Sequence, residues 1–119
     1  MVTPNTTSNI TVRQGQDGIA EIRLKGYIDA YSYNQIEEVF NQIINKGIYK
    51  LIVDLSEVNY LSSVGAGLLI NVFSRTQENR GNLVVLKPSP PVKEVLDLLG
   101  LSNLFTVTND HARALGVFN

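Results

Sequence analysis

Two runs of apolar residues, at 51–53 and 83–86, constrain the fold of this 119-residue chain more than any other feature. Each run is continuous rather than alternating, and both consist only of leucine, isoleucine and valine. Such a run is typical of a strand that is buried on both faces. The pattern therefore predicts an α/β fold built around a mostly parallel sheet.

The first part of the chain predicts a hairpin followed by a helix. Residues 10–14 and 19–24 alternate apolar and polar side chains on either side of a turn signal, which favours two antiparallel strands. Apolar residues then recur at helical spacing from 36 to 44 and predict a helix with one apolar stripe. Ser32 and Gln35 have capping-box spacing, so Ser32 is the expected start of this helix.

Two further helices are predicted after the apolar runs. The strand at 51–53 is expected to end at Asp54, and a loop then crosses the carboxyl edge of the sheet. A helix is expected from about Ser63 to Glu78. Ser89 is expected to open the third helix, because prolines follow it in the first turn, where a missing N–H costs nothing.

The end of the chain predicts a short strand or extended segment at 104–107 and a final helix, capped by Thr108 and ending at Leu115. The predicted fold class is α/β, with an N-terminal β-hairpin followed by alternating strands and helices. We expect one domain over residues 9–119, with a mixed, mostly parallel sheet of roughly four to five strands and about four helices. Residues 1–8 are polar and are expected to form a flexible tail.

Charge and composition argue against several function classes. The chain has 10 basic and 11 acidic residues and no cysteine. No basic cluster suits nucleic acid or an anionic membrane surface, and no thiol is present for catalysis, disulfides or zinc. The sequence has no signal-peptide pattern and no apolar run near the ~20 residues of a membrane span. We therefore expect a cytoplasmic domain that binds neither nucleic acid nor a membrane.

Ser62 and Ser63 stand where the second helix is expected to begin, and Gly65 and Gly67 follow at once. A glycine inside a helix costs roughly 1 kcal/mol relative to alanine. The pair therefore needs a reason, which is either close approach of a partner or packing within the chain. A phosphate on Ser63 would meet free backbone N–H groups and the positive end of the helix dipole. The alternative is that the serines serve only as a helix cap.

Residues 61–68, Leu-Ser-Ser-Val-Gly-Ala-Gly-Leu, resemble the phosphorylation-site motif of bacterial anti-sigma factor antagonists, which are STAS-domain proteins. Three further segments, at 24–29, 51–56 and 95–105, are similar to the same family. Together the matches cover nearly the whole chain, and several ordered matches are more specific than one short motif. The resemblance implies a STAS-type domain.

By this resemblance, Ser63 is the phosphoacceptor and Asp29 is the acidic residue near it. Ser62 stands where many family members have aspartate, which makes Ser62 a second candidate acceptor. Val64 is larger than the usual residue at its position. The predicted partner-binding surface comprises Asp29, Tyr60, Ser62, Ser63, Val64, Gly65 and Gly67.

The function that the resemblance implies is a partner switch. The unphosphorylated chain binds an anti-sigma factor that is also a serine kinase, which frees the sigma factor. Phosphorylation of Ser63 abolishes this binding, and a PP2C-type phosphatase restores it. The chain is then a ligand and a substrate, not an enzyme, and it needs no cofactor. The alternative is a STAS scaffold or transport-system subunit that has no link to a sigma factor.

Other chemistry has little support in the sequence. Leu61 occupies the first glycine position of a nucleophile elbow, and no Walker or dinucleotide-binding loop is present. His111, the single histidine, is expected to be a solvated helix residue. Asp29, Asp54 and Glu57 are too scattered to predict a metal site. Four tyrosines flank the predicted edge, either as partner contacts or as core residues: Tyr27, Tyr31, Tyr33 and Tyr60.

Overall fold

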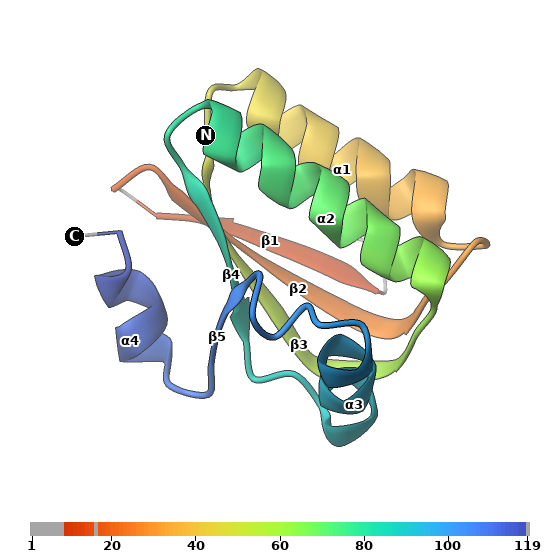
Figure 1. Cartoon of the computed structure of the whole chain (residues 1–119). Coiled ribbons are helices and arrows are strands. Elements are labelled where there is room, and N and C mark those ends of the chain that lie inside the picture. Colours follow the sequence, from red (N-terminus) through yellow and green to blue (C-terminus); the bar gives the residue numbers. More distant parts are fainter. Residues whose placement is uncertain (1–8, 16, 119) are drawn as a thin grey trace.

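A computed structural model describes residues 9–15 and 17–118 as an α/β fold (Figure 1). The predicted tail at residues 1–8 lies outside the described residues. Within them the chain forms a five-stranded sheet and four helices, which confirms the predicted fold class. None of these helices is long and apolar enough to cross a membrane. The elements in chain order are β1 (Ile10–Gln14), β2 (Ile19–Ile28), α1 (Tyr33–Asn45), β3 (Lys50–Leu61), α2 (Ser63–Glu78), β4 (Asn82–Leu86), α3 (Pro90–Leu98), β5 (Thr106–Thr108) and α4 (His111–Gly116).

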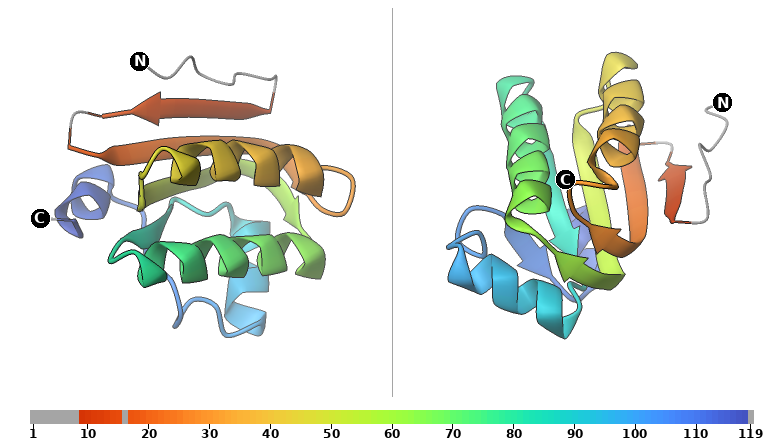
Figure 2. Two further views of the ribbon diagram at one scale, coloured as in Figure 1. Left: turned by 90° about the horizontal axis from the view of Figure 1, so that it is seen from above. Right: turned by 90° about the vertical axis from the view of Figure 1, so that its right-hand side faces the viewer.

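The sheet has the strand order β1-β2-β3-β4-β5. β1 and β2 are antiparallel and the other three pairings are parallel, which confirms the predicted hairpin and the mostly parallel sheet. Helices α1 and α2 lie side by side over one face of the sheet (Figure 2). A side-chain hydrogen bond joins them, because Arg75 Nη1 of α2 donates to Asn41 Oδ1 of α1 at 2.5 Å.

Alternate residues of the central strands enter different cores. Leu51 and Val53 of β3 belong to the large core beneath α1 and α2, whereas Ile52 belongs to a smaller core with Ala114 of α4. β4 is divided in the same way. Because both faces of these strands are covered at 51–53 and 83–86, every position of these two segments is apolar and the sequence runs are continuous. The prediction that these strands are buried on both faces is confirmed.

The predicted end of a strand at Asp54 is wrong, because β3 continues to Leu61. β2 ends at Ile28 and pairs with this extension. Register shifts interrupt the pairing. The buried residues Leu55, Val58 and Leu61 are therefore three apart rather than two apart, and the segment lacks the alternation by which a strand is recognised.

The predicted start of α1 at Ser32 is confirmed, whereas the predicted cap of α4 is wrong. Ser32 directly precedes α1, but it has a helical rather than an extended conformation and its side chain makes no capping hydrogen bond. At α4 the cap is Asp110, whose carboxylate accepts from the N–H of Ala112 at 2.9 Å. Asp110 directly precedes the helix in an extended conformation, which is the geometry that an N-cap requires. Thr108 instead ends β5 and accepts from the N–H of Asp110 at 3.1 Å.

The last strand begins later than predicted. β5 covers Thr106–Thr108, and residues 104–105 belong to the turn after α3. Phe105 is buried there, with its ring edge-on to that of Phe73 of α2 and the centroids 5.3 Å apart. Its side chain thus fills the large core from a turn, which an apolar pattern alone does not distinguish from a strand.

Candidate functional site

The carboxyl ends of β2 and β3 bring the predicted site residues to one edge of the sheet. Tyr27 pairs with Tyr60, and Ile28 pairs with Leu61, in the parallel register. The N–H of Ser62 then donates to the carbonyl oxygen of Ile28 at 2.9 Å. The two segments that follow, the β2–α1 loop and the start of α2, consequently leave the sheet side by side.

Ser62 and Ser63 have different environments at the start of α2. Ser62 is half-buried, and its hydroxyl oxygen accepts from the N–H of Gly65 at 3.0 Å, so Ser62 is the N-cap. Ser63 is the first residue of the helix and is exposed. Its N–H and that of Val64 precede the first helical hydrogen bond, which runs from Ala66 to Ser62. A phosphate on Ser63 would therefore lie near unused N–H donors and the positive end of the helix dipole.

Loss of the Ser62 cap is expected to destabilise the chain. Ser62→Ala leaves the N–H of Gly65 without its acceptor, which should lower the free energy of unfolding by about 1 kcal/mol. Ser62→Asp is the control, because it keeps an acceptor at the same place and adds a charge that suits a helix N-terminus. Urea denaturation of the three proteins measures the difference. Equal stability of Ser62→Ala and wild type would contradict the capping role.

The two glycines of α2 differ in what surrounds them. A Cβ atom on Gly65 would lie 2.4 Å from the carbonyl oxygen of Ile28 and 2.7 Å from its Cγ2. Gly65 therefore allows α2 to approach β2 closely, which is a packing role within the chain. A Cβ atom on Gly67 would meet nothing within 4 Å, and Gly67 is exposed. No contact in the described part of the chain explains its helical cost of roughly 1 kcal/mol.

A hydrogen-bond network holds the β2–α1 loop beside the start of α2. Asp29 Oδ1 accepts from the N–H of Tyr31 at 3.0 Å and from the N–H of Ser32 at 3.2 Å. The hydroxyl oxygen of Ser32 accepts from the N–H of Asp29 at 3.1 Å and donates to the carbonyl oxygen of Tyr27 at 2.8 Å. Sequence reasoning missed this role of Ser32, although serine and aspartate a few residues apart are typical of such turns.

Four apolar side chains remain exposed around this edge. Tyr31 is 98% exposed, Tyr27 60%, Tyr60 49% and Val64 47%. The rings of Tyr27 and Tyr60 lie against each other, with centroids 6.0 Å apart. We call these four residues the apolar rim. Tyr33, by contrast, packs against the large core, so the structure separates the four tyrosines that the sequence left undivided.

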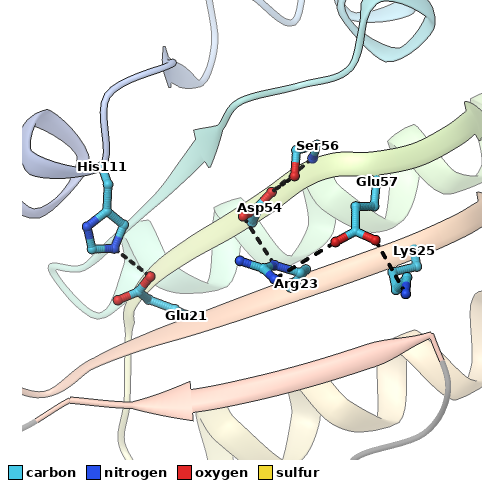
Figure 3. A network of polar contacts seen from close by, with 7 residues as sticks. All are labelled: Glu21, Arg23, Lys25, Asp54, Ser56, Glu57 and His111. Carbon is cyan, nitrogen blue, oxygen red and sulfur yellow. Dashed lines mark hydrogen bonds and ion pairs between the residues drawn. The ribbon is translucent and has the colours of Figure 1, made fainter.

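A polar network on β2 and β3 occupies the other acidic residues that the sequence singled out (Figure 3). Arg23 reaches Asp54 at 3.4 Å and Glu57 at 3.8 Å, and Lys25 reaches Glu57 at 3.3 Å. Asp29 instead holds the β2–α1 loop. Within residues 9–15 and 17–118, no three acidic or histidine side chains are grouped so that they could hold a metal ion.

His111 is exposed at the start of α4, in agreement with the prediction of a solvated helix residue, and it also makes a specific contact. Its Nε2 lies 2.7 Å from Oε1 of Glu21, so the contact joins α4 to β2 (Figure 3). The two residues are 90 positions apart in the sequence. A pair at that separation has no local sequence pattern, which is why the prediction did not include it.

The chain is a small α/β domain with the strand order β1-β2-β3-β4-β5, a layer of α1 and α2 on one face, and a serine–glycine start of α2. Comparison with known proteins identifies its family. The family model of the STAS domain matches residues 11–114. The chain belongs to the STAS domain family.

Individual relatives agree with this assignment. The anti-sigma-B factor antagonist of Staphylococcus epidermidis is 30% identical over 91 residues, which is 76% of this chain and 84% of the relative. An anti-sigma factor antagonist from Mycobacterium paratuberculosis has a similar structure, with a TM-score of 0.79 at 24% identity, covering 94% of this chain and 96% of its own. SpoIIAA in its unphosphorylated form has a TM-score of 0.77 at 21% identity, with 89% and 92% covered. SpoIIAA of Bacillus in its phosphorylated form has a TM-score of 0.71 at 21% identity, with 92% and 99% covered.

Proposed function

We propose that the chain is an anti-sigma factor antagonist that acts as a phosphorylation-controlled partner switch. In its unphosphorylated form it binds an anti-sigma factor that is also a serine kinase, and the sigma factor is released. The observation that carries the proposal is the exposed Ser63 at the start of α2, next to Val64 of the apolar rim. Phosphorylation there changes the charge of a binding surface without touching the core.

Ser63 is the better phosphoacceptor of the two serines. Ser62 is half-buried and its hydroxyl accepts from the N–H of Gly65, so a kinase would have to break the cap to use it. The hydroxyl of Ser63 carries no such task. An exposed hydroxyl can be aligned with the γ-phosphate of ATP, as phosphoryl transfer requires.

The switch is a balanced phosphoryl transfer followed by hydrolysis. The γ-phosphoryl group moves from ATP, bound to the partner, to Oγ of Ser63, while the hydroxyl proton passes to a base of the partner and ADP leaves. The product gains about −1.5 to −2 charge close to Asp29. Desolvating this charge against a partner surface that fits a neutral hydroxyl ends the contact. A PP2C-type phosphatase then uses water to release inorganic phosphate and restore the serine.

The rest of the surface contacts the partner directly or supports the contact. Asp29, Tyr60, Val64 and Gly67 are exposed or half-buried at the same edge, and Gly65 sets the position of α2 through its packing on Ile28. On this proposal the chain works in the cytoplasm as ligand and substrate, with no catalysis, cofactor, nucleic acid or membrane of its own. The names of the staphylococcal relative and of the two SpoIIAA forms support it.

Phosphopeptide mapping tests the proposal. The chain is incubated with ATP and a candidate serine kinase encoded by a neighbouring gene, and the intact mass is then measured. We expect one added phosphate, located on Ser63, present in Ser62→Ala and absent from Ser63→Ala. If an active kinase of this kind adds no phosphate, the chain is better described as a STAS scaffold or transport-system subunit with no link to a sigma factor.

A further inference from the structure

Tyr31 has the most exposed large apolar side chain in the described part of the protein, at 98%. It lies in the β2–α1 loop, two residues beyond Asp29. An aromatic ring in water leaves a large apolar surface unburied. Such a side chain can bury about 150–250 Å² when it finds a partner. The remaining tyrosines of the edge, Tyr27 and Tyr60, at least cover part of each other.

The backbone beneath this exposed ring is held firmly. The N–H of Tyr31 donates to Asp29 Oδ1 at 3.0 Å, and Ser32 ties Asp29 to Tyr27 through its hydroxyl. The loop is therefore ordered before any partner arrives, and only the side chain of Tyr31 remains to be immobilised. A rigid backbone that presents an aromatic side chain loses little conformational entropy on binding, which is the property of an interface anchor.

The chemistry around Tyr31 limits what it can enter. In the segments 27–33 and 60–67, Asp29 is the only charged residue, and the other exposed large side chains are the apolar ones of the rim. A carboxylate without accompanying lysine or arginine is poorly suited to an anionic lipid surface. An apolar pocket on a protein suits both the ring and its hydroxyl, provided that the pocket rim offers a hydrogen-bonding group.

We propose that Tyr31 anchors the partner complex by inserting its ring into an apolar pocket of the partner protein, with Asp29 and Ser32 as positioning residues that hold the loop. The inference rests on the proposed function and deepens it, because it names the part of the surface that contributes most of the affinity. Ser63 then decides whether the surface can dock, and Tyr31 decides how tightly it docks.

Calorimetric titration against the neighbouring-gene kinase tests the anchor. Tyr31→Ala is expected to weaken binding about 30-fold or more, the range of an interface hot spot. Tyr31→Phe keeps the ring and should stay within about fivefold of wild type, because one hydrogen bond is lost. Leu98→Ala is the matched control, since Leu98 is an apolar side chain that is 79% exposed on α3, and it should bind as wild type does.

A double-mutant cycle tests the positioning role. Ser32→Ala should weaken binding in the wild-type background and raise the KM for phosphorylation of Ser63 with kcat unchanged, while Ser32→Thr, which keeps a hydroxyl, should restore both. In the Tyr31→Ala background, Ser32→Ala should add little, because the side chain that it positions is gone. Full additivity of the two changes would show that Ser32 does not act through Tyr31.

The outcomes separate this inference from the proposed function. If Tyr31→Ala binds as wild type while Ser63→Asp does not, the anchor is wrong and the switch stands. If both variants bind as wild type, or if wild type does not bind the kinase, the proposed function and the anchor both fail. A last experiment measures whether the chain sediments with vesicles of anionic phospholipid. If wild type sediments with the vesicles and Tyr31→Ala does not, Tyr31 binds a membrane, and the assignment of a protein pocket is overturned.

Discussion

Ser63→Asp is expected to weaken binding of the anti-sigma factor kinase by about a hundredfold, whereas Ser63→Ala is expected to bind as tightly as the unphosphorylated protein. A charge placed against a partner surface that fits a neutral hydroxyl costs several kcal/mol through desolvation and like-charge contact. A change of about 1.4 kcal/mol in binding free energy is already tenfold in affinity. Calorimetric titration of each variant measures the difference.

The control for this experiment adds the same charge elsewhere on the same helix. Ser74 is an exposed serine of α2, and it lies about 16 Å along the axis from Ser63 at the helical rise of ~1.5 Å per residue. Ser74→Asp should therefore bind close to wild-type strength. Equal affinities for Ser63→Asp and Ser63→Ala would be incompatible with a switch at this residue.

Loss of binding by Ser63→Asp would not reflect unfolding. Ser63 is exposed at the first position of α2, and a carboxylate in the first turn of a helix is favourable by about 0.3–1 kcal/mol. The variant should unfold close to the wild-type temperature, because this favourable effect offsets repulsion from the nearby Asp29. The helix dipole and the partner surface thus act in opposite directions on the same charge, so stability and binding can be measured as separate effects.

The fold was predictable where every side chain of a segment is buried, because each position then carries an apolar residue. Leu51, Ile52 and Val53 are all apolar because alternate side chains enter two cores, and that continuity identifies a central strand. The extension of β3 to Leu61 was not predictable in the same way, because register shifts with β2 remove the alternation. Register shifts depend on how two strands pair, so the sequence of either strand alone does not predict them.

The candidate site was predictable in its residues but not in their division of labour. A serine pair before a helix is consistent with two helix caps, two phosphorylation sites or one of each. Only the geometry assigns the cap to Ser62, whose hydroxyl accepts from Gly65. The role of Ser32 was hidden for a similar reason, because its hydroxyl bonds backward to Tyr27 rather than forward into α1, and capping-box spacing describes only the forward case.

Alanine at the two glycines of α2 is expected to have opposite effects on stability. A Cβ atom on Gly65 would overlap the backbone of Ile28, which cannot move without disturbing β2. Gly65→Ala should therefore lower the free energy of unfolding by about 2–3 kcal/mol. Gly67→Ala meets nothing within 4 Å and should raise it by about 1 kcal/mol, the helix propensity difference. Thermal unfolding compares the two variants with wild type.

The Gly67→Ala substitution is expected to weaken partner binding although it stabilises the free protein. If this glycine is retained because the partner approaches the bare backbone of α2, the added methyl group of Gly67→Ala should weaken binding by about tenfold although it stabilises the free protein. Gly116→Ala is the matched control, because a Cβ atom at this exposed position of α4 also meets nothing. A more stable Gly67→Ala that binds as tightly as wild type would remove Gly67 from the interface and leave Gly65 as the one glycine of the pair with a physical reason.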